Sequence, residues 1–160
     1  MEFVNGLKHE ELVYSRLASV QGTVVPVFLG SLQLHRPFSY DGIVEIVQLM
    51  CMGFVGRTLA CQHALDRHQM IQRAGISLRK IHDFGVLHSD PIPGNMTWNE
   101  QDRCVMFIDF ERSTLYPQRR MPLGLICNQK RKREAGPLEK SPNKGLDCFE
   151  RERRRMINGL

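Results

Sequence analysis

The stretch VLHSDPIPGN at residues 86–95, followed by VMFIDFE at residues 105–111, decides how this sequence is interpreted. Asp90 and Asn95 stand five residues apart in a polar loop, and two prolines between them fix φ and stiffen that loop. Asp109 follows an apolar run with the composition of a buried strand, so we expect it where that strand ends. Two carboxylates and one amide are therefore predicted on two neighbouring loops, from which they can point at one spot.

These three side chains suit phosphoryl transfer. That reaction needs oxygen ligands that hold magnesium against phosphate groups, and a carboxylate that orients the incoming hydroxyl. We expect Asp90 to orient the acceptor hydroxyl or to accept its proton. We expect Asn95 and Asp109 to bind the magnesium ion.

Each of the three residues also has an ordinary structural use. Asp90 can hydrogen-bond nearby backbone amides, as loop aspartates often do, and Asn95 can close a turn. Asp109 can cap the segment that follows it. Taken alone, each residue leaves both interpretations open; their joint spacing favours a shared site.

The flanking sequence alternates between helical and strand patterns. Apolar residues recur at helical spacing in residues 7–20 and 58–82, which predicts two helices, the second followed by Gly85. Short runs rich in β-branched and aromatic residues predict strands of an antiparallel sheet, ahead of a hairpin with a polar turn. The predicted strands are residues 23–29, 31–35, 43–50, 96–98 and 104–108.

The two decisive segments resemble the catalytic loop and the metal-binding segment of the protein-kinase superfamily, where His-x-Asp-x-x-x-x-Asn precedes an Asp-Phe segment by about one short hairpin. Upstream, residues 81–90 are similar to the end of the long kinase helix, and residues 10–30 to the helix that bears the ion-pair glutamate. The resemblance covers about residues 7–116 and extends to fungal protein-kinase-like proteins, which share an Asp-Phe-Glu-Arg ending of the metal segment.

The resemblance implies an α+β fold. Residues 1–120 would form a partial protein-kinase-like domain, with an incomplete antiparallel sheet and a helical catalytic lobe. Residues 121–160 would form a basic, largely disordered tail, in which the charged stretch around Arg151 to Arg155 can form one short helix. ATP and magnesium would be the cofactors, and His88 would brace the loop from beneath. Glu10 would bind the cofactor as the ion-pair acid, with Glu11 as the alternative.

Several departures from the kinase pattern leave open whether the chain is an enzyme. Ser89 replaces the arginine that reads a phosphorylated activation loop. The Gly-rich phosphate-covering loop and the strand lysine would both lie before Met1, and Lys8 cannot replace that lysine because it lies within the predicted helix. No Ala-Pro-Glu segment follows Asp109. We therefore expect a catalytically feeble chain, either a degenerate pseudokinase or a truncated product.

Three functions remain open at this stage. The first is ATP-dependent phosphoryl transfer to a hydroxyl by a protein-kinase-like domain. The second is a small-molecule kinase that resembles aminoglycoside or choline phosphotransferases, which share the Asp-Phe-Glu pattern of residues 109–111. The third is a pseudokinase scaffold without catalytic activity, which would bind a protein partner through its helical face and basic tail.

Charge and cysteine content limit the partners and the compartment. The formal charge of +5 lies entirely in residues 128–160, which hold 10 basic and 5 acidic side chains, whereas residues 1–127 hold 12 of each. We therefore expect neither nucleic-acid nor membrane binding by the domain. For the KRKR cluster at residues 130–133 we favour a solvated tail over a nuclear localisation signal or a patch that contacts nucleic acid. Five widely spaced cysteines favour a reducing compartment, cytoplasmic or nuclear, and we see neither a signal peptide nor a membrane span.

Overall fold

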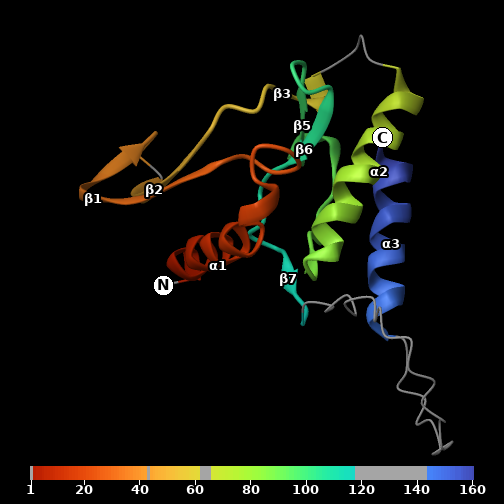
Figure 1. The fold of residues 1–160 in the computed structure, drawn as a ribbon. Helices are drawn as coiled ribbons and strands as arrows, with labels where there is room; N and C mark the ends of the chain where they lie inside the picture. The colour runs from red at the N-terminus through yellow and green to blue at the C-terminus, as the bar shows by residue number, and fades with distance from the viewer. Residues whose placement is uncertain (1, 43, 62–65, 118–143) are drawn as a thin grey trace, which may run out of the picture.

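Helices and antiparallel strands alternate along the chain in the computed structural model, which describes residues 2–42, 44–61, 66–117 and 144–160 (Figure 1). The α+β class expected from the sequence is therefore confirmed. The helices are α1 (Glu2–Arg16), α2 (Arg67–Asp83) and α3 (Lys144–Gly159), with 3-10 turns η1 (Ala18–Val20), η2 (Leu59–Cys61) and η3 (Pro93–Asn95). The strands are β1 (Phe28–Tyr40), β2 (Val44–Met52), β3 (Arg57–Thr58), β4 (Val86–Leu87), β5 (Met96–Asn99), β6 (Cys104–Phe107) and β7 (Thr114–Leu115).

Helix α2 begins later than the sequence pattern predicts. Its N-cap is Asp66, whose carboxylate accepts hydrogen bonds from the backbone N–H groups of His68 and Gln69. This cap stabilises a helix start at residue 67, so the predicted start at residue 58 is wrong, and residues 57–61 form β3 and η2 instead. The predicted apolar face is present, since the residues buried on α2 are Ala74, Ser77, Leu78 and Ile81.

Strands β1 and β2 form an antiparallel hairpin, and the bounds of β1 differ from those that the sequence pattern predicts. Residues 28–40 run as one strand through Gly30 and Pro37, where two short strands with a break were predicted, and residues 23–27 are not a strand. Register shifts between Phe28 and Gly30 and between Gln33 and Phe38 accommodate both residues. Irregular pairing removes the need for a ladder N–H at proline, so the strand continues.

The hairpin β5–β6 matches the sequence prediction to within one residue. Met96 pairs with Phe107 and Asn99 with Cys104, and β3 adds to the free edge of β5. The turn is held by Asn99, whose side-chain Oδ1 accepts the N–H groups of Gln101 and Asp102. The position of this hairpin fixes where the first decisive segment ends and where Asp109 follows, because Asn95 directly precedes β5 and residue 108 directly follows β6.

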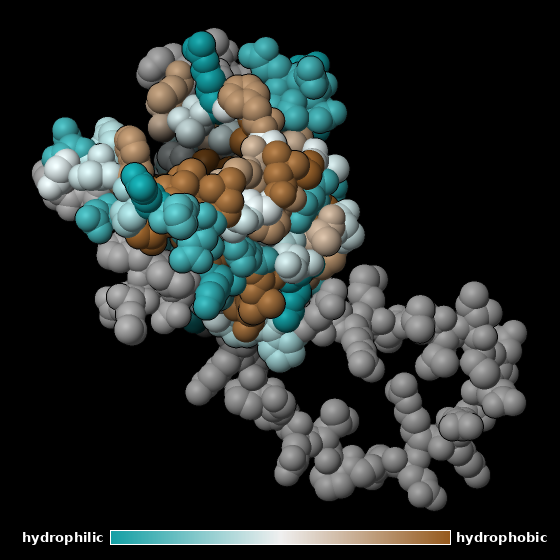
Figure 2. Space-filling model, turned by 90° about the vertical axis from the view of Figure 1, so that its left-hand side faces the viewer, coloured by the Kyte–Doolittle hydropathy of each residue, from teal (hydrophilic) through white to brown (hydrophobic). Residues whose placement is uncertain are grey.

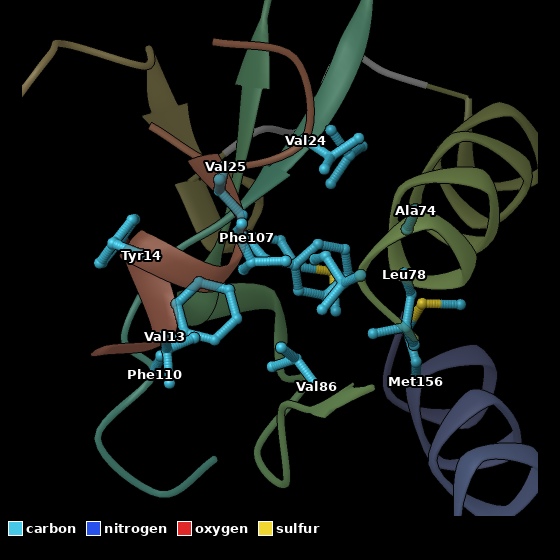
Figure 3. Packing of buried hydrophobic residues seen from close by; sticks show 14 of the residues in the cluster. Val13, Tyr14, Val24, Val25, Ala74, Leu78, Val86, Phe107, Phe110 and Met156 are labelled. Atoms are coloured by element: carbon cyan, nitrogen blue, oxygen red, sulfur yellow. The ribbon is translucent and has the colours of Figure 1, made fainter. Parts of the chain in front are cut away.

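One hydrophobic core joins the helices to this hairpin. Its side chains come from the three helices, from the segment after η1, from η2, from β4, β5 and β6 and from Phe110, and Figure 3 shows most of them packed together. Phe107 is fully buried, and its backbone N–H donates to the carbonyl of Val24. The labelled members are Val13, Tyr14, Val24, Val25, Ala74, Leu78, Val86, Phe107, Phe110 and Met156.

Helix α3 lies along α2 and departs from the expectation of a largely disordered tail over residues 121–160 (Figure 1). Met156 is buried in the shared core, and the Phe149 ring lies 4.7 Å from that of His82. The expected domain end at residue 120 and the KRKR cluster lie outside the described residues, because the structure does not describe residues 118–143. Residues 144–159 are helical, which is longer than the short helix around Arg151 to Arg155 allowed by the sequence.

The face that carries α1 and the β1–β2 hairpin has hydrophobic side chains on its surface (Figure 2). The exposed apolar residues of β1, β2 and the following loop include Leu29, Phe38, Tyr40, Leu49 and Phe54. Among the described residues, no helix combines the length and the apolar character needed to cross a membrane.

Candidate functional site

His88 lies beneath the loop that carries Asp90. Its ring is fully buried, lies 4.7 Å from the Phe110 ring, and donates through Nε2 to the carbonyl of Ile108 at 3.0 Å. Burial lowers the pKa of His88 from its ordinary value of 6.5, so the imidazole is neutral at pH 7. The ring thus ties the loop that carries Asp90 to Ile108, the residue just before Asp109.

Asp90 and Asn95 are brought together, as the sequence predicts. The side-chain Nδ2 of Asn95 donates to the carbonyl oxygen of Asp90 at 3.1 Å and lies 3.4 Å from its Oδ2 atom. The same carbonyl accepts the N–H of Ile92 at 2.9 Å, which closes the loop between them. With its amide nitrogen engaged in this way, Asn95 retains its Oδ1 atom as an oxygen ligand.

Asp109 comes directly after Ile108, the residue that connects its segment to the loop of Asp90 and Asn95. The N–H of Ile108 donates to the carbonyl of Asn95 at 3.0 Å, so the start of the Asp109 segment lies against the end of the loop. Asp109 is exposed, and within the described residues no ion pair involves it. Its φ of 64° lies in the left-handed region, which non-glycine residues seldom adopt outside functional or turn positions.

The carboxylates of Asp90 and Asp109 both affect the pKa of the buried His88 ring. Both Asp109 and Asp90 raise the pKa of His88 by their negative charge, against the larger opposing effect of burial. Arg112 lies 3.7 Å from Asp90, measured from Nη1 to Oδ2, but its side chain is 77% exposed. An exposed pair at this distance contributes little to stability, and the Asp90 side chain is itself 31% exposed, so a ligand can reach it.

Glu10 contacts the segment after Asp109 instead of a basic side chain. Its Oε1 atom accepts the backbone N–H of Phe110 at 3.1 Å. Burial raises the pKa of Glu10, and the nearby charges of Asp109 and Glu111 add to that effect. The predicted role as an ion-pair acid for the nucleotide stays a prediction, because no described cation pairs with Glu10.

Sequence reasoning missed a second contact between α1 and the same segment. His9 Nε2 donates to the carbonyl of Ser113 at 2.9 Å, and the Ser113 hydroxyl donates to the carbonyl of Phe110 at 2.7 Å. With Glu10, this contact fixes both ends of residues 110–113 to α1. The sequence signal was slight, since His9 and Ser113 are 104 residues apart and belong to no motif.

The donor set fits magnesium in kind. The Asp109 carboxylate and the Asn95 amide oxygen are hard oxygen ligands, which magnesium prefers in combination with water and phosphate. Among the described residues, no three His, Cys, Asp or Glu side chains gather closely enough to hold a metal ion, and the expected ligands are one carboxylate and one amide. A cavity of about 320 Å³ lies near the other end of β5, between residues 54–57 and 98–101, and none of Asp90, Asn95 and Asp109 lines it.

Comparisons with known proteins find relatives in sequence and likenesses in structure. No protein-family model matches the chain. Over 133 residues the chain is 35% identical to a protein named meiotic driver SPOK2 from the fungus Podospora anserina, and the match covers 83% of this chain and 16% of that protein. The chain therefore spans only a small part of this relative.

The solved structures similar to this chain include a bifunctional kinase-methyltransferase, WbdD. One crystal structure of WbdD is 19% identical in sequence, with a TM-score of 0.49, over 71% of this chain and 24% of that one. A monomeric form of WbdD is 21% identical, with a TM-score of 0.47, over 69% of this chain and 26% of that one.

Proposed function

We propose that this chain contains the catalytic loop and the metal-binding segment of a protein-kinase-like phosphotransferase that uses ATP, in a degenerate or truncated form of low activity. Asn95 and Asp109 are the proposed magnesium ligands, and Asp90 is the proposed catalytic carboxylate. The observation that supports this proposal best is the joining of the two segments. Asn95 holds Asp90 through its side chain and Ile108 through its carbonyl, so one residue links both loops.

Each side chain has a chemical role in this proposal. The Asp90 carboxylate orients the acceptor hydroxyl and takes its proton as the hydroxyl oxygen bonds to the γ-phosphorus of ATP. The bond from that phosphorus to the bridging oxygen breaks, and ADP leaves with the electron pair. Magnesium, when bound, neutralises charge on the phosphate oxygens. The Asn95 Oδ1 atom and the Asp109 carboxylate would hold the magnesium ion, and the hydrogen bond from Asn95 Nδ2 to Asp90 restrains the Asn95 amide.

The sequence relative supports a fungal origin for this type of domain but does not identify an acceptor. Its name, meiotic driver, describes a protein of which this chain spans 16%. The alternatives are a small-molecule phosphotransferase and a non-catalytic scaffold. Glu111 was the residue that suggested a small-molecule kinase, but its carboxylate lies against Gly6 of α1, so its position favours neither substrate class.

Isothermal titration calorimetry tests the proposal with three proteins of full length. The unchanged chain should bind a non-hydrolysable ATP analogue only when magnesium is present. Asp109→Ala should lower that affinity by at least about 10-fold, because a lost ligand costs no less than a lost outer-shell partner. Asp83→Ala is the matched control, since Asp83 is exposed at the end of α2 and should leave the affinity unchanged.

The outcomes separate the alternatives. Binding that does not depend on magnesium, or that survives Asp109→Ala, would contradict the metal site. Absence of binding by the unchanged chain would favour the scaffold. Binding lost in both variants would show that the substitutions disturb the fold, and circular dichroism checks that point directly.

A further inference from the structure

The β1–β2 hairpin has an open edge on each of its two strands. Among the described residues β1 pairs only with β2, and β2 only with β1, so the outer side of each strand presents backbone N–H and C=O groups that no neighbouring strand uses. The hairpin lies on the side of the molecule away from α2 and α3 (Figure 1). An open strand edge of this kind is a template for pairing with another chain.

The two open edges differ in what they allow. Strand β1 contains Pro37, which has no N–H, and its pairing is irregular between Gln33 and Phe38; both features protect an edge against further pairing. Strand β2 runs for 9 residues without proline or glycine, and Glu45 is its only charged residue. The edge of β2 is therefore the one that can accept a further strand.

Apolar side chains are exposed beside the edge of β2. Val47 and Leu49 are 37% and 42% exposed and, being two residues apart, point to the same face of the hairpin. Leu32 of β1 pairs with Leu49 and is 46% exposed on that face. A strand added at this edge would cover part of this apolar surface, which favours association in water.

The sequence of β2 is complementary to itself when two copies run antiparallel. A twofold axis through Gln48, the middle residue of β2, pairs the whole strand with its copy. In this register Val47 of each copy faces Leu49 of the other, so the exposed apolar side chains meet. Glu45 faces Cys51, so no two like charges are opposed. One register therefore satisfies the backbone, the apolar side chains and the charge together.

We infer that β2 is a dimer edge: two copies of this chain pair their β2 strands antiparallel about Gln48 and form one continuous sheet in the order β1–β2–β2–β1. A two-stranded hairpin is marginally stable alone, whereas a sheet of three or more strands with an apolar face is stable by itself. The dimer places Leu32, Val47 and Leu49 of both copies on one face. This contact needs neither nucleotide nor magnesium, so it is independent of the proposed function.

Analytical ultracentrifugation of the full chain tests the dimer. The unchanged chain of 18.5 kDa should reach twice that mass in a dilution series that extends to about 0.1 mM, where a dimer with a micromolar dissociation constant is largely formed. Leu29→Lys is the control variant, because Leu29 is 68% exposed on β1, outside the proposed contact, and should leave the dissociation constant unchanged. A chain that stays monomeric throughout the series would overturn the inference.

Two double variants test the register. Val47→Lys combined with Leu49→Lys sets like charges against each other across the twofold axis, whereas Val47→Lys combined with Leu49→Glu sets opposite charges there. Both variants remove the same apolar side chains, so they differ only in the sign of this pair. The like-charge variant should have a dissociation constant at least about 10-fold higher than the opposite-charge variant. Equal dissociation constants, or loss of the dimer in Leu29→Lys, would contradict this register.

A disulfide crosslink tests the position of the axis, and it decides the matter if circular dichroism shows that a double variant does not fold. In a background of Cys51→Ser and Cys61→Ser, which removes two exposed cysteines, Gln48→Cys should give a disulfide-linked dimer under mild oxidation, because the axis places residue 48 opposite itself. Leu32→Cys in the same background is the matched control and should stay unlinked, since β1 lies one strand away from the axis. Equal crosslinking of the two variants, or none in Gln48→Cys, would contradict the dimer.

Discussion

The loop region of residues 86–116 is packed against the rest of the protein, whereas the hairpin of residues 28–52 is largely exposed. In the loop region His88, Phe107 and Phe110 are fully buried and receive contacts from α1, α2 and α3. In the hairpin Leu29 and Tyr40 are 68% and 63% exposed, and among the described residues β1 and β2 pair only with each other. Two-stranded hairpins are marginally stable alone, so the candidate site should be the more stable of the two regions.

The largest expected effect comes from removing a buried aromatic ring from the loop region, compared with removing an exposed one from the hairpin. Phe107→Ala should lower the free energy of unfolding by about 3–5 kcal/mol, because it leaves a cavity in the core beneath the loop. Phe38→Ala, on the exposed hairpin, should change that free energy by no more than about 0.5 kcal/mol. Urea unfolding followed by tryptophan fluorescence of Trp98 measures both. Similar losses for the two variants would contradict the contrast drawn between the regions.

A smaller effect should appear in the pH dependence of stability. Burial lowers the pKa of His88 below 6.5, so in acid the unfolded chain takes up a proton at this ring that the folded chain does not. The contribution of His88 to the free energy of unfolding should therefore be present in full above pH 6.5. It should fall as the pH decreases, by up to about 1.4 kcal/mol per pH unit.

The matched variant for this measurement is His88→Gln, which has no group that titrates there. Urea unfolding at pH 7.5 and pH 5.5 should give a smaller decrease for the variant than for the unchanged chain. The remaining histidines contribute to both proteins, so they cancel in the comparison. Equal decreases would show that His88 is protonated as readily in the folded chain as in the unfolded one.

What the sequence predicted well is local in the chain. The turn at Asn99, the apolar alternation of β5 and β6 and the five-residue step from Asp90 to Asn95 all act over short separations, and all of these elements form as expected. The class of fold followed from the order of these patterns. The proximity of Asp90 and Asn95 also followed, because a loop of that length leaves little freedom once prolines fix its φ angles.

What the sequence did not predict depends on distant partners. A glutamate in a charged stretch is normally solvated, whereas Glu152 is buried and accepts the N–H groups of Ser89 and His88, which lie 63 and 64 positions earlier in the chain. The spacing of Phe149, Glu152 and Met156 on one helical face was a usable signal for packing. Two other departures have local causes: the late start of α2 depends on the cap at Asp66, and the length of β1 depends on two irregularities in its pairing with β2.

The central claim is that Asp90, Asn95 and Asp109 surround one metal position, and manganese tests it most directly. Mn²⁺ replaces magnesium at oxygen sites and broadens the NMR signals of nearby nuclei. With Mn²⁺ and ADP added to the ¹⁵N-labelled chain, the account predicts that the amide signals of these three residues broaden first and together, and that Asp109→Ala abolishes the effect. Broadening spread over the acidic surface, or confined to residues far from this loop, would contradict it.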